Sequence, residues 1–175
     1  MSNYYILDSV TSIEDFVSIA DSLHILNDGA CRRGEFQFLS HDPISIEVDE
    51  SSGDIFQDLI YESGVLLISN RMKSFFDKLE IDYLYYKKIF LTKKDLGIEE
   101  IYWLALPERI DCLDRKLSAI NKRNEAKDIV INENMTGRYE IFRLLGVANT
   151  EIIISDRMAD LLKNSGFSGF YVDEL

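Results

Sequence analysis

The side chains able to do chemistry in this chain of 175 residues are mainly carboxylates. There are 31 Asp and Glu residues, against only two His and two Cys. Paired carboxylates can serve as general acid and base or hold a divalent metal, so a carboxylate-dependent hydrolase is one function that the composition allows. Because acids are so numerous, no single pair is distinguished from the others. We therefore predict no catalytic residues.

Metal and thiol chemistry find little support. His24, Cys31 and His41 could in principle meet over zinc, but their spacing matches no zinc motif and no second pair completes four ligands. Cys112 has no histidine in its half of the sequence to act as a base, so we expect it to be a core residue. Phosphate-binding glycine loops and nucleophile motifs do not occur. We predict no metal and no cofactor.

The charge distribution is more informative. The formal net charge is -12, and no Lys or Arg occurs between Gly34 and Asn70. Such a run is commonly a solvated face, but it can also dock a basic protein, and it disfavours nucleic acid and anionic membrane as partners. We predict a partner-binding surface made of acids with aromatic anchors: Glu47, Asp49, Glu50, Asp54, Asp58 and Glu62, with Phe56, Tyr61, Tyr85 and Tyr86.

A repeated pattern predicts the elements that position these residues. Residues 68–72 read Ile-Ser-Asn-Arg-Met and residues 154–158 read Ile-Ser-Asp-Arg-Met. Each follows an apolar run and precedes an apolar pair at helical spacing, which is typical of a strand, a serine N-cap and a helix. A tyrosine then follows at the same offset, at Tyr85 and Tyr171. We predict a duplicated strand-helix-strand unit, the second helix ending at Gly166.

The rest of the chain predicts an α+β fold with mixed or antiparallel sheets. A capping box at 11–14 begins an expected helix that runs to Leu23, and strands are expected over 3–7, 35–39, 44–48, 81–91, 101–106, 129–131 and 139–144. No linker composition divides the chain, so we expect one domain, 1–175, with two related halves, about 1–95 and 96–175. No segment has the apolar length of a membrane span and none resembles a leader, so a cytoplasmic location is expected.

Several short motifs follow one another in the second part of the chain. They are Asp58-Leu59 with Gly64, Leu67-Ile68-Ser69, Tyr83 to Tyr86, Tyr102-Trp103-Leu104, Asp111 and Asp114 with Ser118, Ile141-Phe142-Arg143-Leu144, and Ile153 to Asp156 followed by Gly166, Gly169 and Tyr171. In this order they resemble the immunity protein eleven family of bacterial polymorphic toxin systems. The resemblance covers about residues 54–175, and residues 1–53 resemble nothing recognised.

The resemblance implies a non-enzymatic cytoplasmic protein that binds and neutralises a cognate toxin encoded alongside it. From the acidic net charge of this chain we further predict that the toxin is basic, as enzymes that act on nucleic acids often are. A carboxylate- or metal-dependent hydrolase and a regulatory binding module without a toxin remain alternatives, and the oligomeric state is not predicted. Ten motif residues are expected to serve folding: Ser69, Arg71, Asp111, Asp114, Ser118, Arg143, Ser155, Arg157, Gly166 and Gly169.

Overall fold

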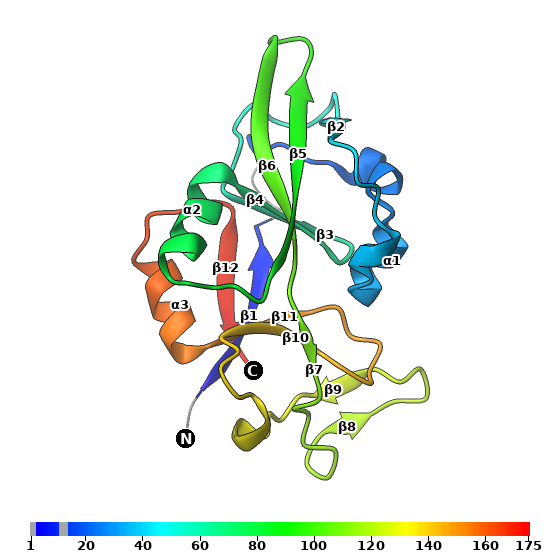
Figure 1. Cartoon of the computed structure of the whole chain (residues 1–175), viewed down its shortest axis with the longest axis vertical. Helices are drawn as coiled ribbons and strands as arrows, with labels where there is room; N and C mark the ends of the chain where they lie inside the picture. The colour runs from blue at the N-terminus through cyan, green and yellow to red at the C-terminus, as the bar shows by residue number, and fades with distance from the viewer. Residues whose placement is uncertain (1–2, 11–13) are drawn as a thin grey trace. The chain divides into compact units, whose positions relative to one another are not determined.

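The computed structural model describes residues 3–10 and 14–175, and the chain forms two compact units (Figure 1). Unit 1 combines Met1–Asp8, Pro107–Gly166 and Tyr171–Leu175, and unit 2 combines Ser9–Leu106 and Phe167–Phe170. Each is built on a five-stranded sheet with helices. The predicted α+β class with mixed and antiparallel sheets is confirmed.

Unit 2 contains a sheet of strand order β2-β5-β6-β4-β3, in which β2 runs parallel to β5 and the other pairs are antiparallel. Its elements in chain order are the 3-10 helix η1 (Ala20–Leu26), α1 (Asp28–Arg33), the 3-10 helix η2 (Phe36–Phe38), β2 (Ile44–Glu47), β3 (Leu59–Glu62), β4 (Val65–Ser69), α2 (Asn70–Lys78), β5 (Tyr85–Lys93) and β6 (Ile98–Leu106).

The core of unit 2 explains the apolar run in β4. Val65 to Ile68 are fully buried, because this strand lies inside the sheet and is covered on both faces. On one face Leu67 and Leu104 pack in a cluster with residues of η1 and α1. On the other face lies α2, whose Asn70 side chain accepts a hydrogen bond from Trp103 Nε1 at 3.0 Å.

Unit 1 contains a sheet of strand order β12-β1-β11-β10-β7, with β7 parallel to β10, and a separate two-stranded ribbon, β8-β9. Its elements are β1 (Tyr4–Ser9), β7 (Arg109–Ile110), β8 (Ala119–Ile120), β9 (Ala126–Asp128), the 3-10 helix η3 (Glu133–Met135), β10 (Ile141–Leu144), β11 (Ile152–Ser155), α3 (Asp156–Lys163) and β12 (Phe170–Glu174). Its hydrophobic core includes Phe142, Leu144 and Ile153.

The predicted duplication is present as one arrangement built twice. Ser69 caps α2 by accepting from Met72 N, and Ser155 caps α3 by accepting from Met158 N. Each serine also donates its backbone N–H to the residue that precedes the neighbouring strand: Ser69 to Asp58 O at 2.8 Å, and Ser155 to Glu140 O at 2.9 Å. Thus β3-β4-α2-β5 corresponds to β10-β11-α3-β12.

The fourth strand of the repeat is supplied differently in the two units. Ser69 pairs across the sheet with Tyr102 of β6, and Ser155 pairs with Tyr4 of β1. β6 follows β5 in the chain, whereas β1 comes long before β12. The two units are therefore related by a circular permutation, a relationship that the sequence pattern did not predict.

The helix predicted from residue 11 to Leu23 is wrong. Its capping box lies partly at residues 11–13, outside the described residues, and the following residues are extended: Phe16 bridges Ile55, and Val17 N donates to Ile55 O at 3.0 Å. Only η1 is helical. Alternate burial explains the difference, since Val17 and Ile19 both enter the core, as they do in an extended segment.

Two predicted strands are also wrong. Residues 35–39 form η2 instead of a strand, after α1 has been capped by Asn27 and ended by Gly34 in the left-handed conformation. Residues 129–131 form a single bridge, between Leu113 and Ile131. The other predicted strands are confirmed, with boundaries shifted by a few residues.

Candidate partner-binding surface

The acidic run predicted from the sequence lies in unit 2, between β2 and the end of β3. Its members differ in environment. Glu50 and Asp54 are exposed and Glu47 is half-buried, whereas Asp49 and Asp58 are buried. Only part of the run can therefore face a partner directly.

Asp58 uses its carboxylate inside unit 2. It accepts from Ser69 Oγ at 2.7 Å and from Ser168 N at 3.0 Å, and it forms an ion pair with Arg71. Burial raises the pKa of this carboxyl, but the hydrogen bonds from Arg71, Ser69 and Ser168 outweigh burial and hold the pKa below its ordinary value. Asp58 therefore ties together the starts of β3 and α2 and the segment before β12.

Asp49 and Glu62 share one hydroxyl group. Ser18 Oγ lies 2.6 Å from Asp49 Oδ2 and 3.0 Å from Glu62 Oε1, and Asp21 N donates to Asp49 Oδ1 at 3.1 Å. Burial, more than the nearby charges of Asp49 and Asp21, raises the pKa of Glu62 above its ordinary value. These carboxylates hold the loop before η1 against the sheet.

The more exposed acids gather at the turn end of the β5-β6 hairpin. Glu47 pairs with Lys94, which raises the pKa of that ammonium group, and Asp54 Oδ1 lies 3.0 Å from the buried Lys93 Nζ. A cavity of about 260 Å³ lies beside them, lined by Glu47, Val48, Glu50, Lys93, Lys94 and Asp95. We name Glu47, Glu50 and Asp54 the acidic surface.

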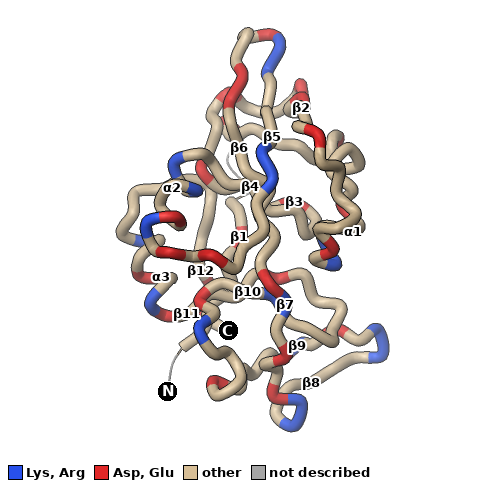
Figure 2. The backbone as a smooth tube through the Cα atoms, viewed as in Figure 1, with Lys and Arg blue, Asp and Glu red and all other residues tan. Residues whose placement is uncertain are grey.

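Strand register continues the acidic surface onto β6. Glu47 is in register with Thr92 of β5, and Thr92 is in register with Glu99 of β6, so these three side chains project from one face. On the same face, the next outward-facing pair is Phe90 and Ile101, of which Ile101 is 39% exposed. Figure 2 shows the basic residues at the turn end of β5 and the acidic residues on the facing part of β6.

The predicted aromatic anchors are all half-buried. Phe56 packs beside Tyr102 with ring centroids 6.4 Å apart, and Tyr85 stacks on Phe36 at 5.0 Å. Tyr61 belongs to β3, and burial raises the pKa of Tyr86. More exposed aromatic side chains occur where the sequence analysis expected a strand, at Phe36 and Phe38, which are 51% and 63% exposed.

The motif residues assigned to folding take up local contacts. Asp114 Oδ1 accepts from Lys116 N at 2.9 Å, and Ser118 Oγ accepts from Val130 N at 3.0 Å. Asp111 is exposed and lies 3.8 Å from Arg115. Arg143 is fully buried in β10.

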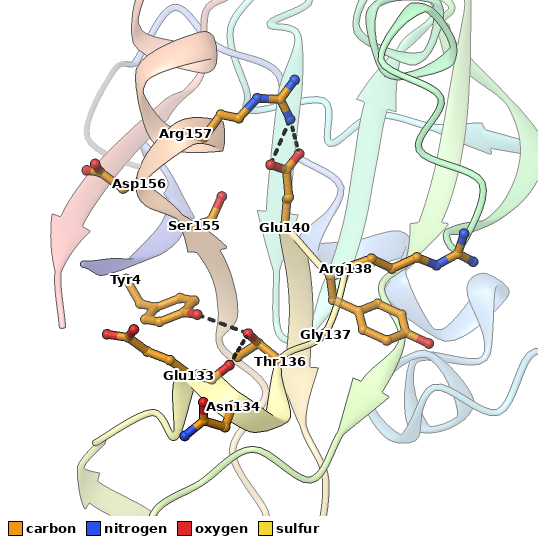
Figure 3. Close-up of a pocket in the computed structure, with 11 residues that line it drawn as sticks. Tyr4, Glu133, Asn134, Thr136, Gly137, Arg138, Glu140, Ser155, Asp156 and Arg157 are labelled. Atoms are coloured by element: carbon orange, nitrogen blue, oxygen red, sulfur yellow. Dashed lines mark hydrogen bonds and ion pairs between the residues drawn. The ribbon is translucent and has the colours of Figure 1, made fainter. Parts of the chain in front are cut away.

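A cavity of about 700 Å³ lies in unit 1. It borders the start of α3 and η3 (Figure 3). Two of its charged groups neutralise each other, because Arg157 Nη1 donates to both carboxylate oxygens of Glu140, at 2.7 and 2.6 Å. A third, Asp156, accepts from Tyr5 at 3.0 Å. The cavity is polar and has no pair of free carboxylates among these groups.

Metal and thiol groups are not assembled into a reactive site in the described parts of the chain. Among residues 3–10 and 14–175, no three His, Cys, Asp or Glu side chains gather in an arrangement that could hold a metal ion. Cys112 is buried, and burial raises the pKa of its thiol to about 12, so it is protonated at neutral pH.

Comparison with protein families matches residues 5–174 to the Immunity protein family (Imm11). The chain belongs to this family. The match extends the resemblance seen at 54–175 to the N-terminal part, so β1 and the first loops of unit 2 belong to the Imm11 sequence pattern as well. Proteins of an immunity family protect against a toxin, in general without catalysis. The comparison with curated proteins gave no match.

Within the described ranges, none of the helices of this Imm11 member combines the length and the apolar character needed to span a membrane.

Proposed function

We propose that this chain is an immunity protein that binds a basic toxin stoichiometrically in the cytoplasm and blocks it without catalysis. The observation that carries the proposal is membership of the Imm11 family over nearly the whole chain, joined to a net charge of -12. A strongly acidic inhibitor is attracted to a basic enzyme over a long range, which raises the rate of association.

The acidic surface is the contact region that we favour. Its acids flank the hairpin end and continue through the register of β2, β5 and β6 to Glu99, so negative charge accompanies partly exposed apolar side chains such as Ile101. Interfaces commonly combine an apolar centre with a polar rim in this way. Asp49, Asp58 and Glu62 use their carboxylates in contacts within unit 2 and are not expected to contact the toxin strongly.

A rescue experiment tests the proposal. The polymorphic-toxin domain encoded immediately upstream is expressed with and without this protein, and growth and co-purification are measured. We expect growth to be restored only when both proteins are present, together with a stable complex whose affinity falls as salt is raised. If growth is not restored and no complex forms, the proposal is contradicted, and a carboxylate-dependent hydrolase becomes the favoured function.

A further inference from the structure

The two halves of β6 are paired differently. Tyr102 to Ala105 lie between β4 and β5 and pair with both. Residues 98–101, the outer segment, pair with β5 alone in the part of the chain that the structure describes. The reason is local: β4 ends at Ser69, opposite Tyr102, where the chain turns into α2. Alternate N–H and C=O groups of the outer segment therefore point away from β5 along an open edge.

The outer segment also exposes apolar side chains. Ile98 is 36% and Ile101 is 39% exposed, and Glu99 and Glu100 between them are exposed as well. An open strand edge with isoleucines is a template for pairing with another chain, and charged side chains are a usual way to restrict which chain can pair. Here both restricting charges are negative.

The sequence of the outer segment, Ile-Glu-Glu-Ile, reads the same in both directions. If two copies paired antiparallel about its centre, Glu99 of one copy would lie opposite Glu100 of the other. Like charges directly opposite destabilise a strand pair, whereas Lys or Arg opposite Glu stabilises it. The edge is therefore unfavourable for self-pairing and favourable for a basic strand.

We propose that the outer segment of β6 is a strand-addition site for an extended basic segment of the cognate toxin. This inference rests on the proposed function and adds the mode of binding to it. Glu99 and Ile101 face one side of the sheet, and Ile98 and Glu100 face the other. The fitting toxin segment therefore has the pattern apolar-basic-basic-apolar. Its main-chain hydrogen bonds supply affinity, and its side chains supply selectivity.

Hydrogen-deuterium exchange of the full chain, with and without the toxin domain encoded upstream, tests this mode. The inward amides of 98–101 are already bonded to β5, so strand addition protects the remaining, outward amides. We expect those amides to exchange at least about tenfold more slowly in the complex. A complex that leaves their exchange unchanged overturns strand addition but not the immunity function. Absence of any complex overturns both.

Matched charge variants provide a second readout. E99K/E100K changes the edge, and D173K/E174K makes the same charge change on two exposed residues of β12. We expect the first variant to weaken toxin binding at least about tenfold more than the second. Equal weakening overturns the proposal. Protection of 98–101 that appears without toxin and increases with the protein's own concentration indicates pairing with a second copy and also overturns it.

Discussion

Arg71 donates to both carboxylate oxygens of Asp58, from Nε at 3.1 Å and from Nη2 at 2.5 Å. The guanidinium group is largely exposed, while the carboxylate is nearly buried. Arg71 stands at the start of α2, where the helix dipole disfavours a cation, and the ion pair with Asp58 offsets this. In unit 1, Arg157 and Glu140 repeat the relationship at the start of α3.

Asp58→Asn should lower the free energy of unfolding by about 2 to 3 kcal/mol, because it removes a charge that Arg71, Ser69 and Ser168 all contact. Urea unfolding at pH 7 measures the change. Asp111→Asn is the control: it removes the acidic partner of Arg115 at an exposed site and should cost below about 1 kcal/mol. An equal loss of unfolding free energy in the two variants would show that the buried Asp58 network is no more stabilising than an exposed ion pair.

The contacts of Asp58 also predict how the stability of the protein changes at low pH. The pKa of Asp58 is lowered from 3.8, so its contribution is complete above the pKa of the unfolded chain and is lost as the pH falls through the lower folded value. We expect the wild-type protein to lose stability below about pH 4 more steeply than Asp58→Asn does. The free energy of unfolding of both proteins is measured from pH 6 to pH 2. If it falls equally steeply in the two proteins, the lowered pKa of Asp58 does not contribute to acid stability.

Glu62→Gln should act in the opposite direction. The pKa of Glu62 is raised from 4.5, so its protonated form is favoured in the folded state, and stability is lost as the pH rises through the raised value. Glutamine keeps the shape and can donate a hydrogen bond, so we expect a gain of roughly 0.5 to 1 kcal/mol at pH 7 and little change at pH 4. Thermal unfolding at both pH values is the measurement, with Glu50→Gln as the exposed control. Similar gains in the two variants would rule out this account.

Gly169→Ala should destabilise unit 2 by more than about 2 kcal/mol. Its φ is +91°, and an added Cβ would lie 2.5 Å from Leu59 O and from Gln57 Cγ. Gly97→Ala separates the two causes, since Gly97 has φ of +65° with no atom within 4 Å of an added Cβ, and it should cost about 1 kcal/mol. Urea unfolding compares the two variants. An equal loss of unfolding free energy would show that the close contacts of the added Cβ at residue 169 do not matter.

E47K/E50K should slow association with the toxin by roughly ten- to a hundredfold at low salt and weaken its salt dependence. Asp54 is kept because it balances the buried Lys93, and Asp49 is kept because it is buried. Stopped-flow binding at several salt concentrations measures the rate, and D173K/E174K provides the same change in net charge. If both variants slow association equally, total charge and not the acidic surface guides the encounter.

Local patterns in the sequence were sufficient for some elements. The serine caps, the apolar run of β4 and the equal spacing of the two helices follow from hydrogen bonding and periodicity within a few residues, and the structure has them all. The apolar residues near Phe16, by contrast, fit a helical period but pair with a distant segment at Ile55. Helical spacing alone could not reveal that competing bridge.

Which of the acidic side chains are exposed could not be predicted from the sequence, for a similar reason. The run contains no Lys or Arg, yet its partners come from elsewhere: Arg71 reaches Asp58, Lys93 reaches Asp54 and Lys94 reaches Glu47. The outer segment of β6 had no signal of its own, because its open edge depends on where β4 ends. The pattern Ile-Glu-Glu-Ile over residues 98–101 does not reveal which edges of a strand are paired.

The circular permutation has a consequence for how the chain folds as it is synthesised. Tyr4 has to wait for Ser155 before β1 can enter its sheet, so nearly the whole chain must leave the ribosome before unit 1 closes. In unit 2, β3, α2 and β5 lie close in sequence to the strands they contact. Unit 1 thus carries the higher contact order, and we expect its assembly to be the slower event in folding.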